Sequence, residues 1–293
     1  MIENLYRVIH IVSPAFSLIA LGFLYNKIAK SDTSSIVRAS LSMLVPAFAF
    51  YHIIVMRQDA NMMSSIFLSA WIIILGNGAL ALFLMKRFNI DRPGLLLPVM
   101  FMNTVNLPFP ILASAYGEQA VSLSIMFYFA SLIGAFTVGI LIVSPKDAKT
   151  EIFKEPIIYV LALGLYIKYN SLDVPSYVMA PLKMLESATV PMVLLALGMQ
   201  LSQVKITEFK LALLGTVLRF AGGLAIGIAC VYFFGFEGLV RKVVLFNSIM
   251  PSAVASFLIA QKFDKDGGLA ASVVLLTTIF SAALIPLMLV WLG

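Results

Sequence analysis

The chain has 293 residues, of which 61% are hydrophobic and only 12% are charged, and its mean hydropathy is +1.01. Soluble globular domains contain about 45–50% apolar and about 25% charged residues. A single core cannot enclose this much apolar surface, so we expect lipid to cover it. The net charge of +6 does not indicate a nucleic-acid partner, because the lysines and arginines fall mostly in short breaks between apolar runs.

Residue counts argue against several kinds of chemistry. The single cysteine, Cys230, excludes an intramolecular disulfide. With only His10 and His52 beside it, we expect no ligand set for a zinc cluster, no bound metal and no cofactor. No HExxH, GxSxG, Walker or paired-aspartate motif occurs, so we do not expect an enzyme.

Ten apolar segments follow one another, and most reach the roughly 20 residues that a helix needs to cross the hydrocarbon. We expect spans near residues 5–27, 34–56, 64–85, 93–115, 119–143, 156–170, 177–202, 209–234, 239–261 and 268–292. The first run is too long for a signal-peptide core and lacks a small-residue cleavage site, so we interpret it as a retained span. The sequence therefore predicts an all-α polytopic protein of the cell inner (cytoplasmic) membrane.

Basic residues are distributed unequally between the two sets of loops. Thirteen lysines and arginines lie in the loops that follow odd-numbered spans, and five lie on the other side. Because cytoplasmic loops carry an excess of basic residues, this count predicts that the odd loops face the cytoplasm and that both termini face outward.

The longest polar break, residues 144–155, divides the spans into five and five. An odd number of spans in each half means that the second half starts from the opposite side. "LSMLVPAFAF" in span two resembles "ESATVPMVLLALG" in span seven, and "NTVNLPFP" in span four resembles "NSIMPSAVAS" in span nine. We therefore predict two inverted five-helix repeats, 1–143 and 156–293, joined by a cytoplasmic linker at 144–155.

Prolines interrupt two of the predicted spans. Pro108 and Pro110 in span four, and Pro251 in span nine, should unwind the helix locally because proline lacks an amide hydrogen. Such backbone is tolerated at membrane depth only where it is buried by protein or lines a cavity. Each break also exposes the positive N-terminus of a half-helix, which suits an anion. A packing kink without a ligand is the alternative.

Several stretches, distributed over the whole chain, resemble the auxin efflux carrier family, which is related to the plant PIN-FORMED transporters. They are "VIHIVSPAFSLIALGFLYNK", "FMNTVNLPFPILASAYGEQAV", "KEPIIYVLALGLYIKY", "SATVPMVLLALGMQL" and "NSIMPSAVASFLIAQKFDKDGGLAASVVLLTTIFSAALIPL". The resemblance implies secondary transport of a small organic anion, two crossed helices (here spans four and nine), a homodimer and an elevator-like motion. The family often has "NTGFLGLP" where this chain has "NTVNLPFP", and often asparagine in place of Ala255.

We expect the substrate to lie where spans four and nine cross. The candidate substrate-binding residues are Asn103, Thr104, Asn106, Pro108, Pro110, Asn247, Ser248, Pro251 and Ser252. The asparagine amides can donate hydrogen bonds to a carboxylate. A non-transporting ligand sensor or an anion channel built on the same fold remains the alternative.

Charged residues inside predicted spans are costly and usually face a cavity or a partner. Glu186 and Lys183 share a helix face, and we interpret them as a candidate H⁺ or Na⁺ coupling site, with a structural ion pair as the alternative. Arg219 is expected to extend to the inner surface, or else to offer a counter-charge to a substrate. His52 is interpreted as a membrane-interface residue rather than a proton relay, and Glu118 as a helix-start residue.

Overall fold

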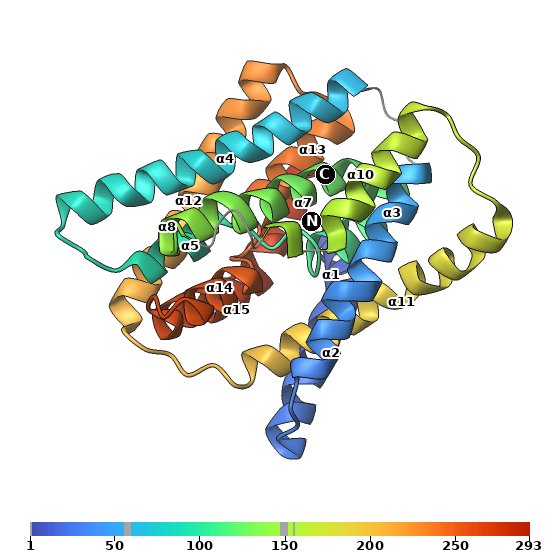
Figure 1. The fold of residues 1–293 in the computed structure, drawn as a ribbon. Helices are drawn as coiled ribbons and strands as arrows, with labels where there is room; N and C mark the ends of the chain where they lie inside the picture. The colour runs from blue at the N-terminus through green and yellow to red at the C-terminus, as the bar shows by residue number, and fades with distance from the viewer. Residues whose placement is uncertain (1, 56–59, 147–151, 155) are drawn as a thin grey trace.

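The computed structural model describes residues 2–55, 60–146, 152–154 and 156–293 (Figure 1). Within these ranges the regular structure is helical, apart from one isolated antiparallel bridge between Met102 and Ser252. The helices are α1 (Ile2–Ala29), α2 (Ser34–Ala39), η1 (Ser40–Leu44, a π-helix), α3 (Val45–Val55), α4 (Ala60–Arg87), α5 (Pro93–Met100), α6 (Pro108–Tyr116), α7 (Glu118–Gly134), η2 (Ala135–Gly139, a π-helix), α8 (Ile140–Val143), η3 (Ile152–Lys154, a 3₁₀-helix), α10 (Pro156–Tyr169), α11 (Ser176–Leu201), α12 (Phe209–Phe234), α13 (Gly238–Ser248), α14 (Val254–Lys262) and α15 (Gly267–Leu292).

Within the described residues, seven helical segments are long and apolar enough to cross a membrane. They coincide with predicted spans one, two, three, five, seven, eight and ten. The sixth span corresponds to the shorter apolar helix α10. The fourth and ninth are each interrupted: α5 stops at Met100 and α6 starts at Pro108, whereas α13 stops at Ser248 and α14 starts at Val254. Most of the predicted 144–155 linker (147–151 and 155) lies outside the described residues.

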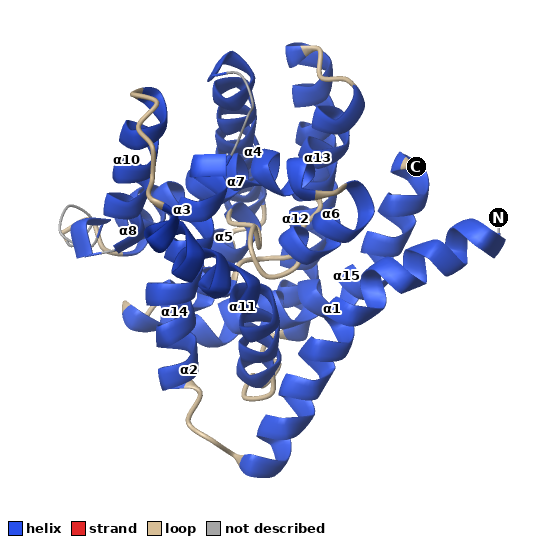
Figure 2. Ribbon diagram, turned by 90° about the vertical axis from the view of Figure 1, so that its right-hand side faces the viewer, coloured by secondary structure: helices blue, strands red, loops and turns tan. Residues whose placement is uncertain are grey.

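The prolines of span four mark where the helix restarts. Pro108 and Pro110 occupy the first turn of α6, and the irregular backbone precedes them at residues 101–107. Proline fits there because the first amides of a helix have no intrahelical acceptor and the ring already fixes φ at a helical value. Figure 2 shows the result, loop segments in the interior of the molecule between the helices.

The helices pack in two groups. In Figure 1, α1, α3, α10 and α11 gather toward one side, and α4, α5, α12, α14 and α15 gather toward the other. Contacts support this division, because α1 packs mainly on α11, and α3 packs on α10 and α11. Helix α12 packs on α4, α5, α13 and α15 in the second group, which also contains α6 and α7. We call these the α11 group and the α12 group.

Glycine allows the closest helix contact within the α11 group. A Cβ atom added to Gly198 would lie 2.0 Å from the carbonyl oxygen of Ile19, and one added to Gly22 would lie 2.2 Å from that of Leu195. The backbones of α1 and α11 therefore approach more closely than any side chain would permit. Small residues serve this role in membrane helix pairs, where close packing replaces the hydrophobic driving force.

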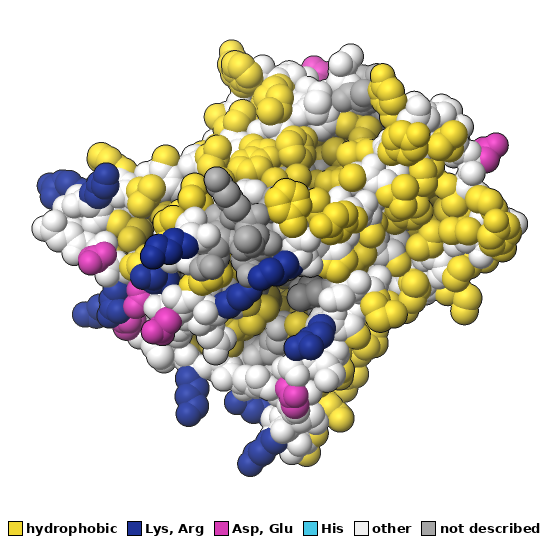
Figure 3. All heavy atoms as spheres, viewed as in Figure 1, with side chains coloured by type: hydrophobic (Ala, Val, Ile, Leu, Met, Phe, Trp, Pro, Cys, Tyr) yellow, Lys and Arg dark blue, Asp and Glu magenta, His cyan; other side chains and the backbone are white. Residues whose placement is uncertain are grey.

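Three predicted cytoplasmic loops meet at one face of the molecule. Arg92, which precedes α5, pairs with Glu208 before α12 and with Asp266 before α15, each over 2.8 Å. Helices α5, α12 and α15 therefore begin at the same face. In Figure 3, lysines and arginines gather along the left and lower part of the view, and the upper and right parts are largely hydrophobic. We call the face that carries Arg92 the basic face.

The two interrupted segments run in opposite directions. The α5–α6 segment starts at the basic face, where Arg92 lies. The α13–α14 segment starts at the other end, where the ammonium of Lys242 bonds the C-terminal Gly293 at the end of α15. Opposite directions are what a pair of inverted repeats would produce. The repeat relationship itself stays a prediction.

Candidate functional site at the crossing of the broken helices

The two interruptions pair directly with each other. The backbone N–H of Asn103 donates to the carbonyl of Pro251 over 2.7 Å, and that of Ala253 donates to Phe101 over 2.8 Å. These bonds flank the antiparallel bridge between Met102 and Ser252. Backbone groups freed by the breaks are thus satisfied by the opposite break, as a site enclosed by protein at membrane depth requires.

Side chains of α13 and the following loop hold this crossing together. The hydroxyl of Ser252 donates to Pro98 over 2.6 Å, and its backbone N–H donates to the hydroxyl of Thr277 over 3.1 Å. Asn247 accepts a hydrogen bond from Ser124 and donates to Val243. These groups are buried, so their bonding capacity is used within the protein.

Arg219 stabilises the crossing from within α12 and is completely buried. Its guanidinium donates to the carbonyls of Val99 and Met100 over 3.1 and 3.4 Å, and to that of Ser248 over 2.5 Å. These carbonyls end α5 and α13, where the helix dipoles are negative. The expectation that Arg219 extends to the inner surface is wrong, because three carbonyl groups inside the protein take the place of water.

A small cavity of about 160 Å³ lies at the crossing. Asn103, Thr104 and Asn106 line it, whereas Pro108, Pro110, Asn247, Ser248, Pro251 and Ser252 do not. Besides these three, its lining is Val37, Ser40, Val45, Met102, Val105, Tyr128, Ser131, Leu132, Ala135, Phe136, Val193, Ala196, Gln200, Ala253, Val254, Ala255 and Leu258. None of these described lining residues is charged. The cavity combines an apolar wall with amide and hydroxyl groups.

The amide of Asn103 has one end committed to its own turn. Its Oδ1 accepts hydrogen bonds from the backbone N–H groups of Val105 and Asn106, over 3.3 and 3.0 Å. Because two backbone donors must face an oxygen, this geometry also fixes the orientation of the amide. The NH₂ end of Asn103 is therefore its available donor. Because the turn uses the amide oxygen, that oxygen is not available to bind a hydroxyl, water or cation in the cavity.

Helix α14 directs its N-terminus toward the same cavity. Val254 and Ala255, its first two residues, both belong to the lining. The first amides of an α-helix have no intrahelical acceptor and carry the positive end of the dipole. Among its described lining residues, the cavity therefore has N–H donors and no carboxylate.

A larger cavity of about 720 Å³ adjoins the first at the basic face. Both are lined by Val37, Gln200 and Leu258, so these three residues lie between them. The larger cavity also contacts Asp32 and Lys205, in loops predicted to be cytoplasmic. Hydrogen bonds from the hydroxyl and N–H of Ser34 lower the pKa of Asp32, which stays ionised. We call this cavity the vestibule.

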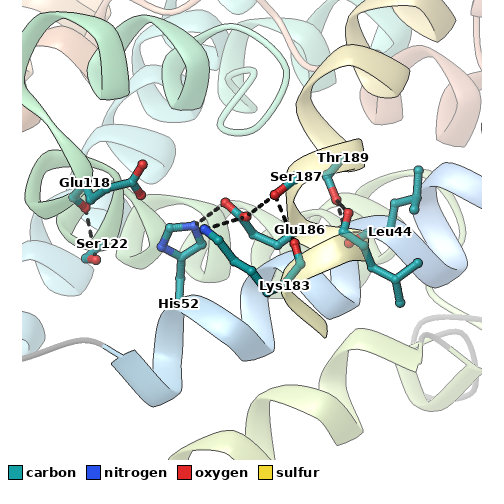
Figure 4. Close-up of polar contacts among 9 residues, drawn as sticks. Leu44, His52, Glu118, Ser122, Lys183, Glu186, Ser187 and Thr189 are labelled. Atoms are coloured by element: carbon teal, nitrogen blue, oxygen red, sulfur yellow. Dashed lines mark hydrogen bonds and ion pairs between the residues drawn. The ribbon is translucent and has the colours of Figure 1, made fainter. Parts of the chain in front are cut away.

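The predicted coupling residues Lys183 and Glu186 lie elsewhere, within α11, beside His52 of α3 and Glu118 of α7 (Figure 4). Lys183 and Glu186 do form the expected pair, at 3.0 Å. Glu186 also contacts Nε2 of His52 at 3.3 Å. His52 is only 1% exposed, so its interpretation as a membrane-interface residue is wrong. Glu118 begins α7 as predicted, and its carboxylate lies near both partners.

Two of these features were missed for identifiable reasons. Counting histidines and cysteines overlooked the carboxylates that the fold places beside His52. Nothing in the sequence around Arg219 shows that the carbonyls of two other helices converge on it. The sequence indicated these features only through the residue types themselves. An arginine or a histidine within an apolar run is costly unless it has a partner, so each should have been expected to have one.

Interrupted helices that cross within a bundle of membrane-spanning helices define a class of polytopic membrane transport proteins. The chain matches the model of the membrane transport protein family over residues 140–289, just over half of its length. It belongs to this family, the auxin efflux carriers, which is a family of transporters and not of enzymes.

Two archaeal relatives are also named as transporters. The chain is 28% identical over 205 residues to an uncharacterized transporter of Methanocaldococcus jannaschii, an alignment that covers 66% of each protein. It is 24% identical over 299 aligned positions to an uncharacterized transporter of Methanothermobacter thermautotrophicus, covering 97% of this chain and 96% of that protein. The second alignment shows that the similarity continues through both halves of the chain.

Proposed function

We propose that this protein is a secondary active transporter that moves a small organic anion, a carboxylate or an auxin-like molecule, across the cytoplasmic membrane. The cavity at the crossing of the two interrupted segments is the main support for this proposal. It offers the NH₂ group of Asn103 and the first amides of α14, with no charged residue among its described lining. Donors at a helix N-terminus favour an anionic group, and the apolar wall favours an organic body.

Access to the cavity supports a carrier. The vestibule adjoins it at the basic face, which the distribution of lysines and arginines predicts to be cytoplasmic. A site reached from one side at a time is the basis of alternating access. In this proposal the conformation described here faces inward.

The two helix groups supply the moving parts. The α12 group contains both interrupted segments and therefore carries the site, while the α11 group forms the wall with Val45, Val193 and Gln200. An elevator-like displacement of the first group against the second would carry the cavity toward the outer side. A homodimer would keep the α11 groups fixed in the membrane, and Glu186 with Lys183 would couple the movement to H⁺ or Na⁺.

Flux measurements in liposomes test this function. The purified full-length protein should accumulate one or more members of a panel of mono- and dicarboxylates, and substrate on the far side should accelerate uptake. A channel would give flux without such acceleration, and a sensor would bind without flux. Varying the proton and sodium gradients separately would identify the coupling ion.

A further inference from the structure

We propose that His52, Glu118 and Glu186 form a binding site for a divalent transition-metal ion, such as Zn²⁺ or Mn²⁺. One nitrogen and two carboxylate oxygens, one from each residue, lie within 4.8 Å of one another. The three residues come from α3, α7 and α11, and Figure 4 shows them around a common space. Imidazole and carboxylate together suit borderline transition metals.

The buried histidine gives an independent reason to look for a ligand. His52 is 1% exposed, and its Nδ1 has no hydrogen-bond partner among the described residues. Its Nε2 contacts Glu186 at a rather long 3.3 Å. A buried polar nitrogen without a partner costs free energy unless something else satisfies the ring. An ion bound by one ring nitrogen would make the imidazole a ligand and would account for its place between two carboxylates, while the other ring nitrogen would carry the hydrogen.

Lys183 explains how the carboxylates are held without the ion. Its ammonium lies 3.0 Å from Oε2 of Glu186, but 52% of its side chain is exposed. Two carboxylates and one ammonium leave an excess of negative charge. A divalent ion entering the space would replace the ammonium, which can swing into solvent, and would bring the cluster closer to neutrality. Lys183 is therefore a competitor for the site and not a ligand.

Only small adjustments are needed to coordinate an ion. Ligand atoms about 2.0–2.2 Å from a tetrahedral metal stand roughly 3.4 Å apart. The present separation of up to 4.8 Å must shrink by about an ångström or more. Glu118 is exposed at the start of α7, so its side chain can rotate to supply this change.

The position of the site gives the ion a consequence. His52 and Glu186 belong to the α11 group, and Glu118 belongs to the α12 group. A metal bound to all three residues would bridge the two groups and fix their relative position. This consequence rests on the proposed transport mechanism, whereas binding of the ion does not.

Metal titration of the full-length protein tests the site. After removal of metals with a chelator, calorimetry with ZnCl₂ should show one ion per chain. His52→Gln, Glu118→Gln and Glu186→Gln should each weaken Zn²⁺ binding at least tenfold. His10→Gln, at the other histidine of the chain, and Glu237→Gln, at an exposed carboxylate, should leave it unchanged. Mg²⁺ should bind far more weakly, because it prefers oxygen ligands in octahedral geometry.

Lys183→Met separates this proposal from a structural ion pair. If the ammonium competes with the ion, its removal should tighten Zn²⁺ binding several-fold. Weaker Zn²⁺ binding in Lys183→Met would overturn the proposal, as would wild-type binding in the three ligand variants or equal binding of Mg²⁺. Bound Zn²⁺ should also slow flux in liposomes. One tight Zn²⁺ site with unchanged flux would retain the metal site and reject only the bridging of the two helix groups.

Discussion

The backbone N–H of Asn103 donates to the carbonyl oxygen of Pro251 over 2.7 Å, and this bond joins two helix interruptions that are almost 150 residues apart in the chain. Both interruptions would be unstable alone in a membrane, because lipid cannot satisfy their free backbone groups. Together they satisfy each other and leave a cavity beside the junction. The same pairing therefore stabilises the fold and builds the candidate site.

Arg219 should be essential for this pairing. We expect Arg219→Met to lower the free energy of unfolding by about 3–5 kcal/mol, because the carbonyls of Val99, Met100 and Ser248 would be left without their buried cationic donor. Arg219→Lys should retain part of the stability, since an ammonium can reach fewer of the three carbonyls. Thermal unfolding of the purified variants in detergent measures both effects, and a Met variant as stable as the wild type would contradict this role.

The close contact of α1 and α11 gives a second stability prediction. Gly198→Ala should destabilise the protein by about 1–3 kcal/mol, because the new methyl group would lie 2.0 Å from the carbonyl of Ile19 and 2.8 Å from the N–H of Phe23. Gly268→Ala is a matched control, since its Cβ would meet only Thr207 at an ordinary 3.4 Å. Equal thermal stability of the two variants would show that α1 and α11 can separate without cost.

The sequence predicted most of the fold because lipid imposes simple rules on length and hydropathy. Seven predicted spans appear as continuous helices, and the interruptions lie beside Pro108 and at Pro251, where proline removes an amide donor. The boundaries within the breaks were less accurate. Pro108 and Pro110 start a helix instead of lying in the unwound part, because a helix tolerates proline in its first turn.

The site was predicted less completely, because it depends on pairings between distant segments. Asn103, Thr104 and Asn106 were recognised from one stretch and do line the cavity. Asn247 and Ser252 were assigned to the substrate because they lie beside the break in span nine, but their polar groups bond to Ser124, Val243 and other protein groups. Which polar group faces a cavity and which supports its wall is decided by tertiary contacts, which residue types do not reveal.

The membrane orientation can be tested with two matched substitutions. Asp91 and Asp173 are both exposed, in loops at opposite predicted sides. In a Cys230→Ala background, Asp173→Cys should react with an impermeant thiol reagent in intact cells, and Asp91→Cys should react only after lysis. This follows from the thirteen-to-five distribution of basic residues, which predicts that both termini lie outside. The reverse labelling pattern would invert the topology and make the vestibule outward-facing.

Glu186 provides a test of coupling. Glu186→Gln keeps the size of the side chain but removes the charge that pairs with Lys183 and contacts His52. If this carboxylate carries the coupling ion, the variant should exchange substrate across liposomes but should no longer concentrate it when a proton or sodium gradient is applied. Accumulation at the wild-type level would assign Glu186 a structural role and place coupling elsewhere.

Substrate recognition should depend most directly on Asn106. Its side chain lines the cavity and makes no hydrogen bond to another described residue, whereas Asn103 also supports the turn. Losing a hydrogen bond to a charged group costs about 1.5–3 kcal/mol, so Asn106→Ala should weaken substrate binding about ten- to a hundredfold with little change in thermal stability. Asn103→Ala should weaken binding similarly and also lower stability, because the N–H groups of Val105 and Asn106 lose their acceptor.

Asn77→Ala is the control, since Asn77 is buried beside Gly222 and away from the cavity. Binding measured by calorimetry with a transported anion should therefore separate the three variants. Equal losses at all three positions would show that the interruption of span four is only a packing kink. Wild-type affinity in both Asn103→Ala and Asn106→Ala would show the same.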